Sequence, residues 1–280
     1  MREIEVSKIT EAVARLCVRS CCALSEDLVA SFHAARSCER SPVGQGIFDI
    51  MIENAEYAAQ KGIPACQDTG MAVCFLEIGQ DVHLCGGSLT DAVNEGVRRG
   101  YVDGHLRLSV VSDPLRRVNS GDNTPAILHT SIVPGDQVRI TVAPKGFGSE
   151  NMSAMKMFKP SATQEDIVQF IVDSVSGAGS NPCPPVIVGV GIGGTIEMAA
   201  LCAKRALLRE VGVQNSDTLY ADLEREALRK INALGIGPQG MGGTVTALAV
   251  HIEQYATHIA GLPCVVNMGC HITRHASETI

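Results

Sequence analysis

The pattern of apolar residues changes once along the chain, and this change constrains the fold more than any other feature. Up to Gly62 the apolar residues recur at helical spacing, for example at Ile9, Val13 and Leu16. From Pro64 onward, short apolar runs are separated by Gly, Pro and Asp, as in strands joined by turns. We therefore predict an α/β mixed (α+β) fold, in which a helical region over residues 1–62 precedes a mixed-sheet region over residues 63–280.

Several elements can be predicted individually. Residues 126–133 and 137–143 are β-rich and flank Pro134-Gly135-Asp136, which predicts a β-hairpin. Thr163 with Asp166 three residues later indicates the start of a helix. The remaining predicted elements are a buried strand at 186–190, a helix after Gly194, a helix at 217–234, and strands at 244–250 and 262–266. With no repeat and no clear linker, we expect a single domain over residues 1–280.

Charge and hydropathy exclude two classes of partner. The net charge is −7, no basic run is long enough to follow a phosphate backbone, and the chain has no Trp for base stacking. Nucleic-acid binding is therefore not expected. The longest apolar stretch, residues 185–192, is much shorter than a membrane span, so no membrane association is expected either.

The chain contains 11 cysteines, an odd number in a sequence whose first residues do not form a signal peptide. We expect reduced thiols and a cytoplasmic location rather than a disulfide framework. Cys17, Cys21 and Cys22 form a C-x3-C-C cluster on a predicted helix, and a buried helix face explains them better than a metal site does.

Three other cysteines lie in predicted loops that proline and glycine constrain, namely Cys66, Cys183 and Cys270. Their separations of 117 and 87 residues match no compact zinc or ferredoxin motif, so spacing alone leaves a metal site open. A thiol nucleophile at Cys66, with a histidine as base, is an alternative.

Glycine-bracketed polar groups in further loops suggest a site for a small anionic ligand. These loops contain Arg107, residues 121–125, residues 145–151 and residues 235–243. The segment 189–194 also contains a literal G-x-G-x-x-G between a predicted strand and a predicted helix. About 20 residues further on, the chain is still in helical pattern, without the strand that a dinucleotide fingerprint requires, so a tight strand-to-helix turn is preferred.

Six motifs in order resemble the α subunit, or N-terminal domain, of the iron–sulfur fumarate hydratases and tartrate dehydratases. They are PACQDTG (64–70), SGDNTPA (120–126), KGFGSEN (145–151), NPCPPVIVGVGIGG (181–194), LGIGPQGMGG (234–243) and GCHITRHA (269–276). They extend over nearly the whole chain, and their combination is highly specific.

The resemblance implies a [4Fe-4S] cluster held by the three loop cysteines, Cys66, Cys183 and Cys270. Three thiolates leave one iron with an open position, which acts as a Lewis acid on a substrate hydroxyl and carboxylate. The resemblance further implies substrate-binding roles for Gln67, Asp68, Arg107, Gly146, Gly148 and His258, with Asp68 and His258 as catalytic residues. An arginine suits a dicarboxylate because its guanidinium pairs bidentately with carboxylate oxygens.

The resemblance also implies a partner. Single-chain members continue into a second domain with further site residues, whereas this sequence ends at Ile280. We therefore expect a separate β subunit, an α2β2-type heteromer, and little activity of this chain alone. Phe147 departs from the family, which commonly has a glycine there, and this leaves the conformation of its loop open.

The resulting expectation is the reversible hydration of fumarate to malate, a reaction of the tricarboxylic acid cycle, because the SGDNTPA loop is closer to the fumarase branch. Dehydration of L-tartrate or another 2-hydroxydicarboxylate is the first alternative. A non-catalytic ligand- or nucleotide-binding subunit is the alternative of another class.

Overall fold

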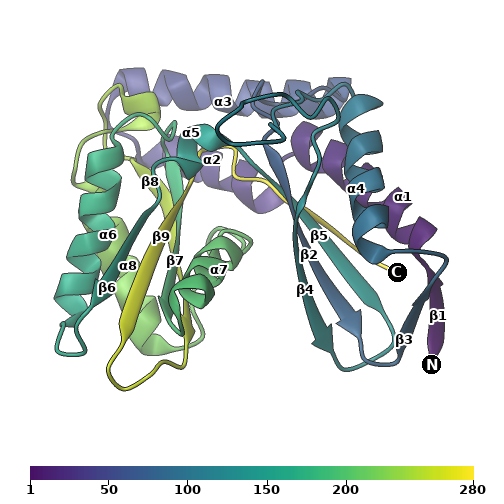
Figure 1. Ribbon diagram of the computed structural model, residues 1–280. Coiled ribbons are helices and arrows are strands. Elements are labelled where there is room, and N and C mark those ends of the chain that lie inside the picture. The colour runs from purple at the N-terminus through teal and green to yellow at the C-terminus, as the bar shows by residue number, and fades with distance from the viewer. The chain divides into compact units, whose positions relative to one another are not determined.

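The computed structural model describes all residues from 1 to 280, which form two compact units (Figure 1). The first unit comprises residues 1–25, 55–146 and 274–280, and the second comprises residues 26–54 and 147–273. The helix α3 (Pro42–Lys61) contributes residues to both. Whether the chain acts as one catalytic domain stays a prediction.

The first unit is built on a four-stranded sheet with two helices packed against it. The strand order is β10 (Ala276–Thr279), β5 (Val138–Lys145), β2 (Met71–Gly79) and β4 (Ile127–Val133). The helices α1 (Val6–Cys22) and α4 (Leu89–Val102) pack on each other and on this sheet (Figure 1). Val13, Leu16, Leu76 and Ile140 are buried in the shared core. A short parallel pair, β1 (Arg2–Glu5) and β3 (Val82–Cys85), lies outside this sheet.

The predicted hairpin at residues 126–143 is wrong in its pairing, although both strands exist. β2 lies between β4 and β5, parallel to β4 and antiparallel to β5. The turn at Gly135 is instead bonded to the turn that follows β2, because the Asp81 N–H donates to the Gly135 carbonyl at 2.9 Å. The turn residues do reverse the chain, but the two strands are far enough apart for β2 to lie between them. Local sequence does not reveal this insertion of a third strand.

The second unit contains a second four-stranded sheet, with helices on both faces. The strand order is β6 (Ala154–Phe158), β9 (Leu262–Gly269), β7 (Val186–Gly193) and β8 (Ala247–Tyr255). The remaining elements are α2 (Glu26–Cys38), α5 (Phe147–Glu150), α6 (Gln164–Ala178), α7 (Ile196–Ala206), α8 (Thr218–Asn232) and η1 (Pro238–Gly240). The helices α6 and α8 share the core made by Val188, Val190 and Ile192. Because side chains alternate along a strand, Gly189 and Gly191 face the other side of the sheet, where α7 lies.

The predicted fold class is confirmed, and several predicted elements are present. Three helices occupy most of the first 62 residues, preceded by the short strand β1. Thr163 caps α6 by accepting from the Asp166 N–H, and the Asp166 side chain accepts from the Thr163 N–H, which completes a capping box. The strand predicted at 244–250 begins at Ala247 and continues to Tyr255.

The glycines of the G-x-G-x-x-G segment allow close packing between β7 and α7. A Cβ on Gly189 would lie 2.3 Å from the Ala203 carbonyl oxygen, and one on Gly191 would lie 1.9 Å from the Ala199 carbonyl oxygen. The nearest parallel strand in sequence, β8, begins only at Ala247. The segment is therefore a packing motif followed by a tight turn, in which Gly193 and Gly194 have positive φ.

We expect Gly191→Ala to destabilise the protein by about 3 kcal/mol, because α7 must move away from the sheet to admit a methyl group. Gly177→Ala in α6 is the matched control, since nothing lies within 4 Å of its added Cβ. The control should be neutral or stabilise by up to about 1 kcal/mol. Urea unfolding of both variants measures the difference, and equal midpoints would contradict the packing described for β7 and α7.

Candidate active site

The loop with Cys66, between α3 and β2 in the first unit, is fixed through its main chain. The Ala65 N–H donates to the Cys21 carbonyl at 3.0 Å, and the Tyr101 hydroxyl donates to the Thr69 carbonyl at 2.8 Å. Tyr101 is fully buried, so this bond anchors the loop to the hydrophobic core. Cys66 itself is partly exposed, with its Sγ 3.6 Å from Gln67 Oε1.

Thr69 connects this loop to Arg107. The Arg107 N–H donates to Thr69 Oγ1 at 2.9 Å, and the Thr69 hydroxyl is 3.3 Å from the Arg107 carbonyl. The two predicted site segments are thus joined through main-chain groups of Arg107. Its guanidinium is not needed for this contact.

Asp68 lies against the loop that follows β5. Its Oδ1 accepts from the Gly70 N–H at 3.0 Å, and a Cβ on Gly146 would lie 2.9 Å from its Oδ2. Arg274, which is 5% exposed, donates from Nη2 to the Asp68 carbonyl at 2.5 Å. The first unit therefore brings Gln67, Asp68, Arg107 and Gly146 into one group of loops around Cys66.

Asn123 joins a third loop to this group, and its role was missed by reasoning from sequence. It is fully buried; its Oδ1 accepts from the Ser109 and Val110 N–H groups at 2.7 and 3.1 Å, and its Nδ2 donates to the Gly70 carbonyl at 3.1 Å. The SGDNTPA motif marked the segment. The positive φ of Asn123, 63°, is unusual for a non-glycine residue and is visible only in the structure.

In the second unit, Cys183 and Cys270 lie at the same end of the sheet. Cys183 precedes β7, Cys270 follows β9, and the antiparallel register pairs Ile187 with Gly269. The His271 N–H donates to the Cys183 carbonyl at 3.2 Å, and His271 Nδ1 is 3.1 Å from the same oxygen. The two cysteine-bearing loops are thus joined by the main-chain hydrogen bond from His271 to Cys183. A Cβ on Gly148 would lie 3.6 Å from the Asn181 carbonyl, which places Gly148 beside the Cys183 loop.

His258 lies at the other end of the same sheet. It occupies the connection between β8 and β9, next to the end of β7, where Gly193 pairs with Tyr255. The eight residues of β7 separate the two ends by about 25 Å. The Nδ1 of His258 accepts from the Ala260 N–H at 3.1 Å. The structure therefore does not bring His258 together with Cys183 and Cys270 within one chain.

The other cysteines differ from these three in burial. Cys17, Cys21, Cys74 and Cys264 are fully buried, and the structure contains no disulfide bond. Burial raises the pKa of the Cys74 thiol and of the Cys264 thiol to about 12, and that of the Cys21 thiol to about 11. These thiols are poor sources of thiolate, whereas Cys183 is exposed and both Cys66 and Cys270 are partly exposed.

No group of three or more His, Cys, Asp or Glu side chains forms a metal-binding set in the structure. Cys66 belongs to the first unit, and Cys183 and Cys270 belong to the second. The donor set nonetheless suits an iron–sulfur cluster, because accessible thiolates are its usual ligands and two of the loops are already joined.

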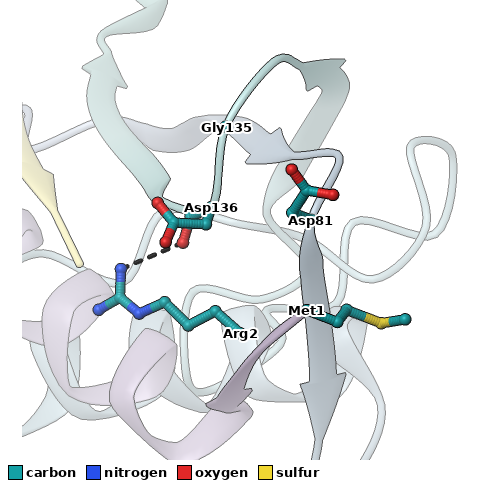
Figure 2. Close-up of a pocket in the computed structure, with 5 residues that line it drawn as sticks. All are labelled: Met1, Arg2, Asp81, Gly135 and Asp136. Carbon is teal, nitrogen blue, oxygen red and sulfur yellow. Dashed lines mark hydrogen bonds between the residues drawn. The ribbon is translucent and has the colours of Figure 1, made fainter.

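Two surface hollows, one in each unit, are lined by residues other than the predicted site residues. In the first unit a hollow of about 400 Å³ is lined by Met1, Arg2, Asp81, Gly135 and Asp136. Figure 2 shows Arg2 extending toward Asp136, where its Nη1 donates to the main-chain carbonyl at 3.1 Å. A second hollow of about 500 Å³ lies in the second unit between α2, α8 and the start of β8.

None of the helices combines the length and the apolar composition that a membrane-spanning helix needs.

Comparison with known proteins identifies the class. Residues 10–279 match the family model for fumarate hydratase (fumerase), and the chain belongs to this family of hydro-lyases. A protein of Methanocaldococcus jannaschii, provisionally described as L(+)-tartrate dehydratase subunit alpha, is 39% identical over 98% of this chain and 98% of its own length. The L(+)-tartrate dehydratase subunit alpha of Escherichia coli strain K12 is 33% identical over 95% of this chain and 88% of its own length.

Proposed function

We propose that this chain is the α subunit of a [4Fe-4S] hydro-lyase that acts on a four-carbon dicarboxylate. The observation that carries the proposal is the joining of the Cys183 and Cys270 loops at one end of the second unit's sheet. The Cys66 loop of the first unit, bound to the Arg107 segment, would supply the third ligand beside a carboxylate-binding group. Family membership supports the same reading.

In the proposed site, Cys66, Cys183 and Cys270 hold the cluster. When bound, the cluster would supply a Lewis-acidic iron with an open position for a substrate hydroxyl and carboxylate. Arg107 pairs with a substrate carboxylate, and Gln67 donates to it from beside Cys66. The loop residues Gly146 and Gly148 approach the substrate closely because they carry no side chain.

Asp68 is the proposed residue for holding or moving the proton that leaves the carbon next to the hydroxyl-bearing carbon. The Gly70 N–H orients its carboxylate through Oδ1. Elimination of water requires a base for this proton and assistance to the hydroxide that departs from the neighbouring carbon. His258 stays a prediction from the family resemblance, without support from the geometry of one chain.

Two substrates are candidates, and the names of the relatives favour the first. L(+)-tartrate loses water to an enol that becomes oxaloacetate, and the relatives at 39% and 33% identity are described as L(+)-tartrate dehydratase subunits. Fumarate hydration to malate is the second candidate, supported by the description of the family model. Both need the same carboxylate-binding and proton-transfer groups.

We further propose a β subunit as partner, in an α2β2-type heteromer, and a cytoplasmic location. The relatives that match this chain along nearly its whole length are called alpha subunits, which supports a separate partner. A non-catalytic nucleotide-binding subunit is the weaker alternative, because Gly189 and Gly191 are occupied in packing against α7.

The proposal is tested with the complex of this chain and its partner subunit, purified without oxygen. The rate of oxaloacetate formation from L(+)-tartrate, compared with the rate of malate formation from fumarate, identifies the substrate. We expect Arg107→Lys to lower kcat/KM by roughly a hundredfold, because a lysine cannot form the bidentate pair with a carboxylate.

Arg116→Lys in an exposed loop of the same unit is the matched control and should retain full activity. Equal kcat/KM for the two variants would remove Arg107 from the site. Absence of activity on every four-carbon 2-hydroxydicarboxylate would contradict the proposed function itself.

A further inference from the structure

The loop at residues 235–243 of the second unit has a backbone that is tightly constrained. A Cβ on Gly237 would lie 2.2 Å from the Gly242 carbonyl carbon, and one on Gly240 would lie 2.3 Å from Ser180 Cβ. Between these glycines, Gln239 has a positive φ of 52°. The loop therefore holds one non-glycine residue in a backbone conformation that such residues seldom adopt.

Gln239 binds both cysteine-bearing loops of this unit. Its main-chain N–H and its Nε2 both donate to the Pro184 carbonyl, at 2.7 and 2.8 Å. Its Nε2 is also 3.3 Å from His271 Nδ1. Pro184 directly follows Cys183, and His271 directly follows Cys270.

A primary amide suits this position for a simple chemical reason. The Nε2 group has two hydrogens, so it donates one to the Pro184 carbonyl and the other to His271 Nδ1 in the tautomer in which that nitrogen carries no hydrogen. In that tautomer His271 donates to the Cys183 carbonyl only through its main-chain N–H. A carboxylate of the same shape would place an oxygen against the Pro184 carbonyl oxygen, and no hydrogen would lie between them. An asparagine would end one methylene short of both partners.

We propose that Gln239 is a positioning residue that fixes the Cys183 and Cys270 loops relative to each other and thereby sets the spacing of two cluster ligands. This role deepens the proposed function and rests on it. Gln239 lies outside the set of ligands and substrate-binding residues inferred above. It acts through Pro184 and His271, in the way that outer-sphere hydrogen bonds orient metal ligands.

The first measurement uses the full-length chain without a cluster. Hydrogen–deuterium exchange is followed in peptides covering residues 181–187 and 268–273 for the wild type, Gln239→Glu and Gln239→Gly. The glycine variant removes the amide without straining the positive φ, so it separates side-chain loss from backbone misfolding. We expect exchange in both peptides to be about fivefold faster in both variants, the effect of losing one hydrogen bond. Unchanged exchange would overturn the proposal.

The second measurement uses the reconstituted protein. Loss of iron to a chelator should be about tenfold faster in the Gln239 variants than in the wild type, with an altered EPR spectrum of the reduced cluster. Gln214→Glu is the control, because this glutamine is exposed on the same unit, and it should match the wild type in both measurements.

The outcomes separate the two proposals. Faster exchange together with normal iron retention and a normal EPR spectrum would overturn the positioning role, because Gln239 would then act only on loop stability. A wild-type chain that takes up no cluster, alone or with its partner subunit, would overturn the proposed function and the role built on it. The exchange rates would still report whether Gln239 joins the two loops.

Discussion

Cys183→Ala and Cys270→Ala should each abolish assembly of a stable [4Fe-4S] cluster and, in the complex with the partner subunit, reduce activity below detection. Cys66→Ala should do the same. Each substitution removes one of only three proposed thiolate ligands, so no spare ligand in the proposed set replaces it. Iron and sulfide content, visible absorption and EPR spectra after anaerobic reconstitution measure the effect.

Cys38→Ala is the control for these variants. Cys38 is exposed at the end of α2 and has no proposed role, so its variant should bind iron and sulfide as the wild type does. Circular dichroism must show that all four variants remain folded. Full cluster content in any one of the three ligand variants would disprove the assignment at that position, while leaving the other two open to their own tests.

Glu39→Gln should lower the free energy of unfolding by about 3 kcal/mol, the second large effect. Glu39 is only 2% exposed, and its carboxylate accepts from the Ser41, Thr244 and Val245 N–H groups at 2.8–2.9 Å. These bonds join the turn between α2 and α3 to the segment that follows the Gln239 loop. An amide of the same shape would direct its hydrogens at N–H groups that need an acceptor.

The same carboxylate predicts a particular dependence on pH. Burial by itself raises the pKa of Glu39, but the hydrogen bonds from Ser41, Thr244 and Val245 outweigh it and hold the pKa below its usual value. A lowered pKa in the folded state means that the stabilisation is complete above the unfolded pKa of about 4.3 and is lost as the pH falls through the folded value. The difference between wild type and Glu39→Gln should therefore be constant from about pH 5 to 8 and shrink below about pH 4.

Urea unfolding across this pH range measures the difference, with Glu210→Gln at an exposed position as the control. The control should stay within about 0.5 kcal/mol of the wild type at every pH. A Glu39→Gln variant as stable as the control at pH 7 would show that this carboxylate does not hold the two segments together.

Local signals in the sequence predicted elements well where the physical cause is local. The helix start at Thr163 depends on a capping box within four residues, and the strand at 186–190 depends on its own continuous apolar run. The predicted hairpin at 126–143 was wrong because strand pairing is not local. The strand β2 lies between the two predicted strands, and its Val73 pairs with Ile127, 54 residues later in the sequence.

The candidate site shows the same division. Motif resemblance assigned Gln67, Asp68, Arg107 and Gly146 to one substrate site, and these roles stay predictions. The first unit joins the loops that carry these residues. It gave no roles to Asn123, Arg274, Glu39 or Gln239, because each acts on residues distant in sequence, through hydrogen bonds that only folding creates. His258 shows the reverse: its twelve-residue separation from Cys270 suggests proximity, yet β9 carries the chain from one end of the sheet to the other between them.

The sequence by itself determined the mixed α and β class, the change at Gly62, and which of the 11 cysteines lie in constrained loops, because periodicity, Gly and Pro act on their immediate neighbours. Only the tertiary structure decided that β2 separates β4 from β5 and that Cys183 and Cys270 share one end of a sheet. It also decided that a glutamine joins their loops. The physical reason is that strand order and hydrogen bonds between distant segments follow from how buried surfaces fit together, and no short stretch of sequence encodes that fit.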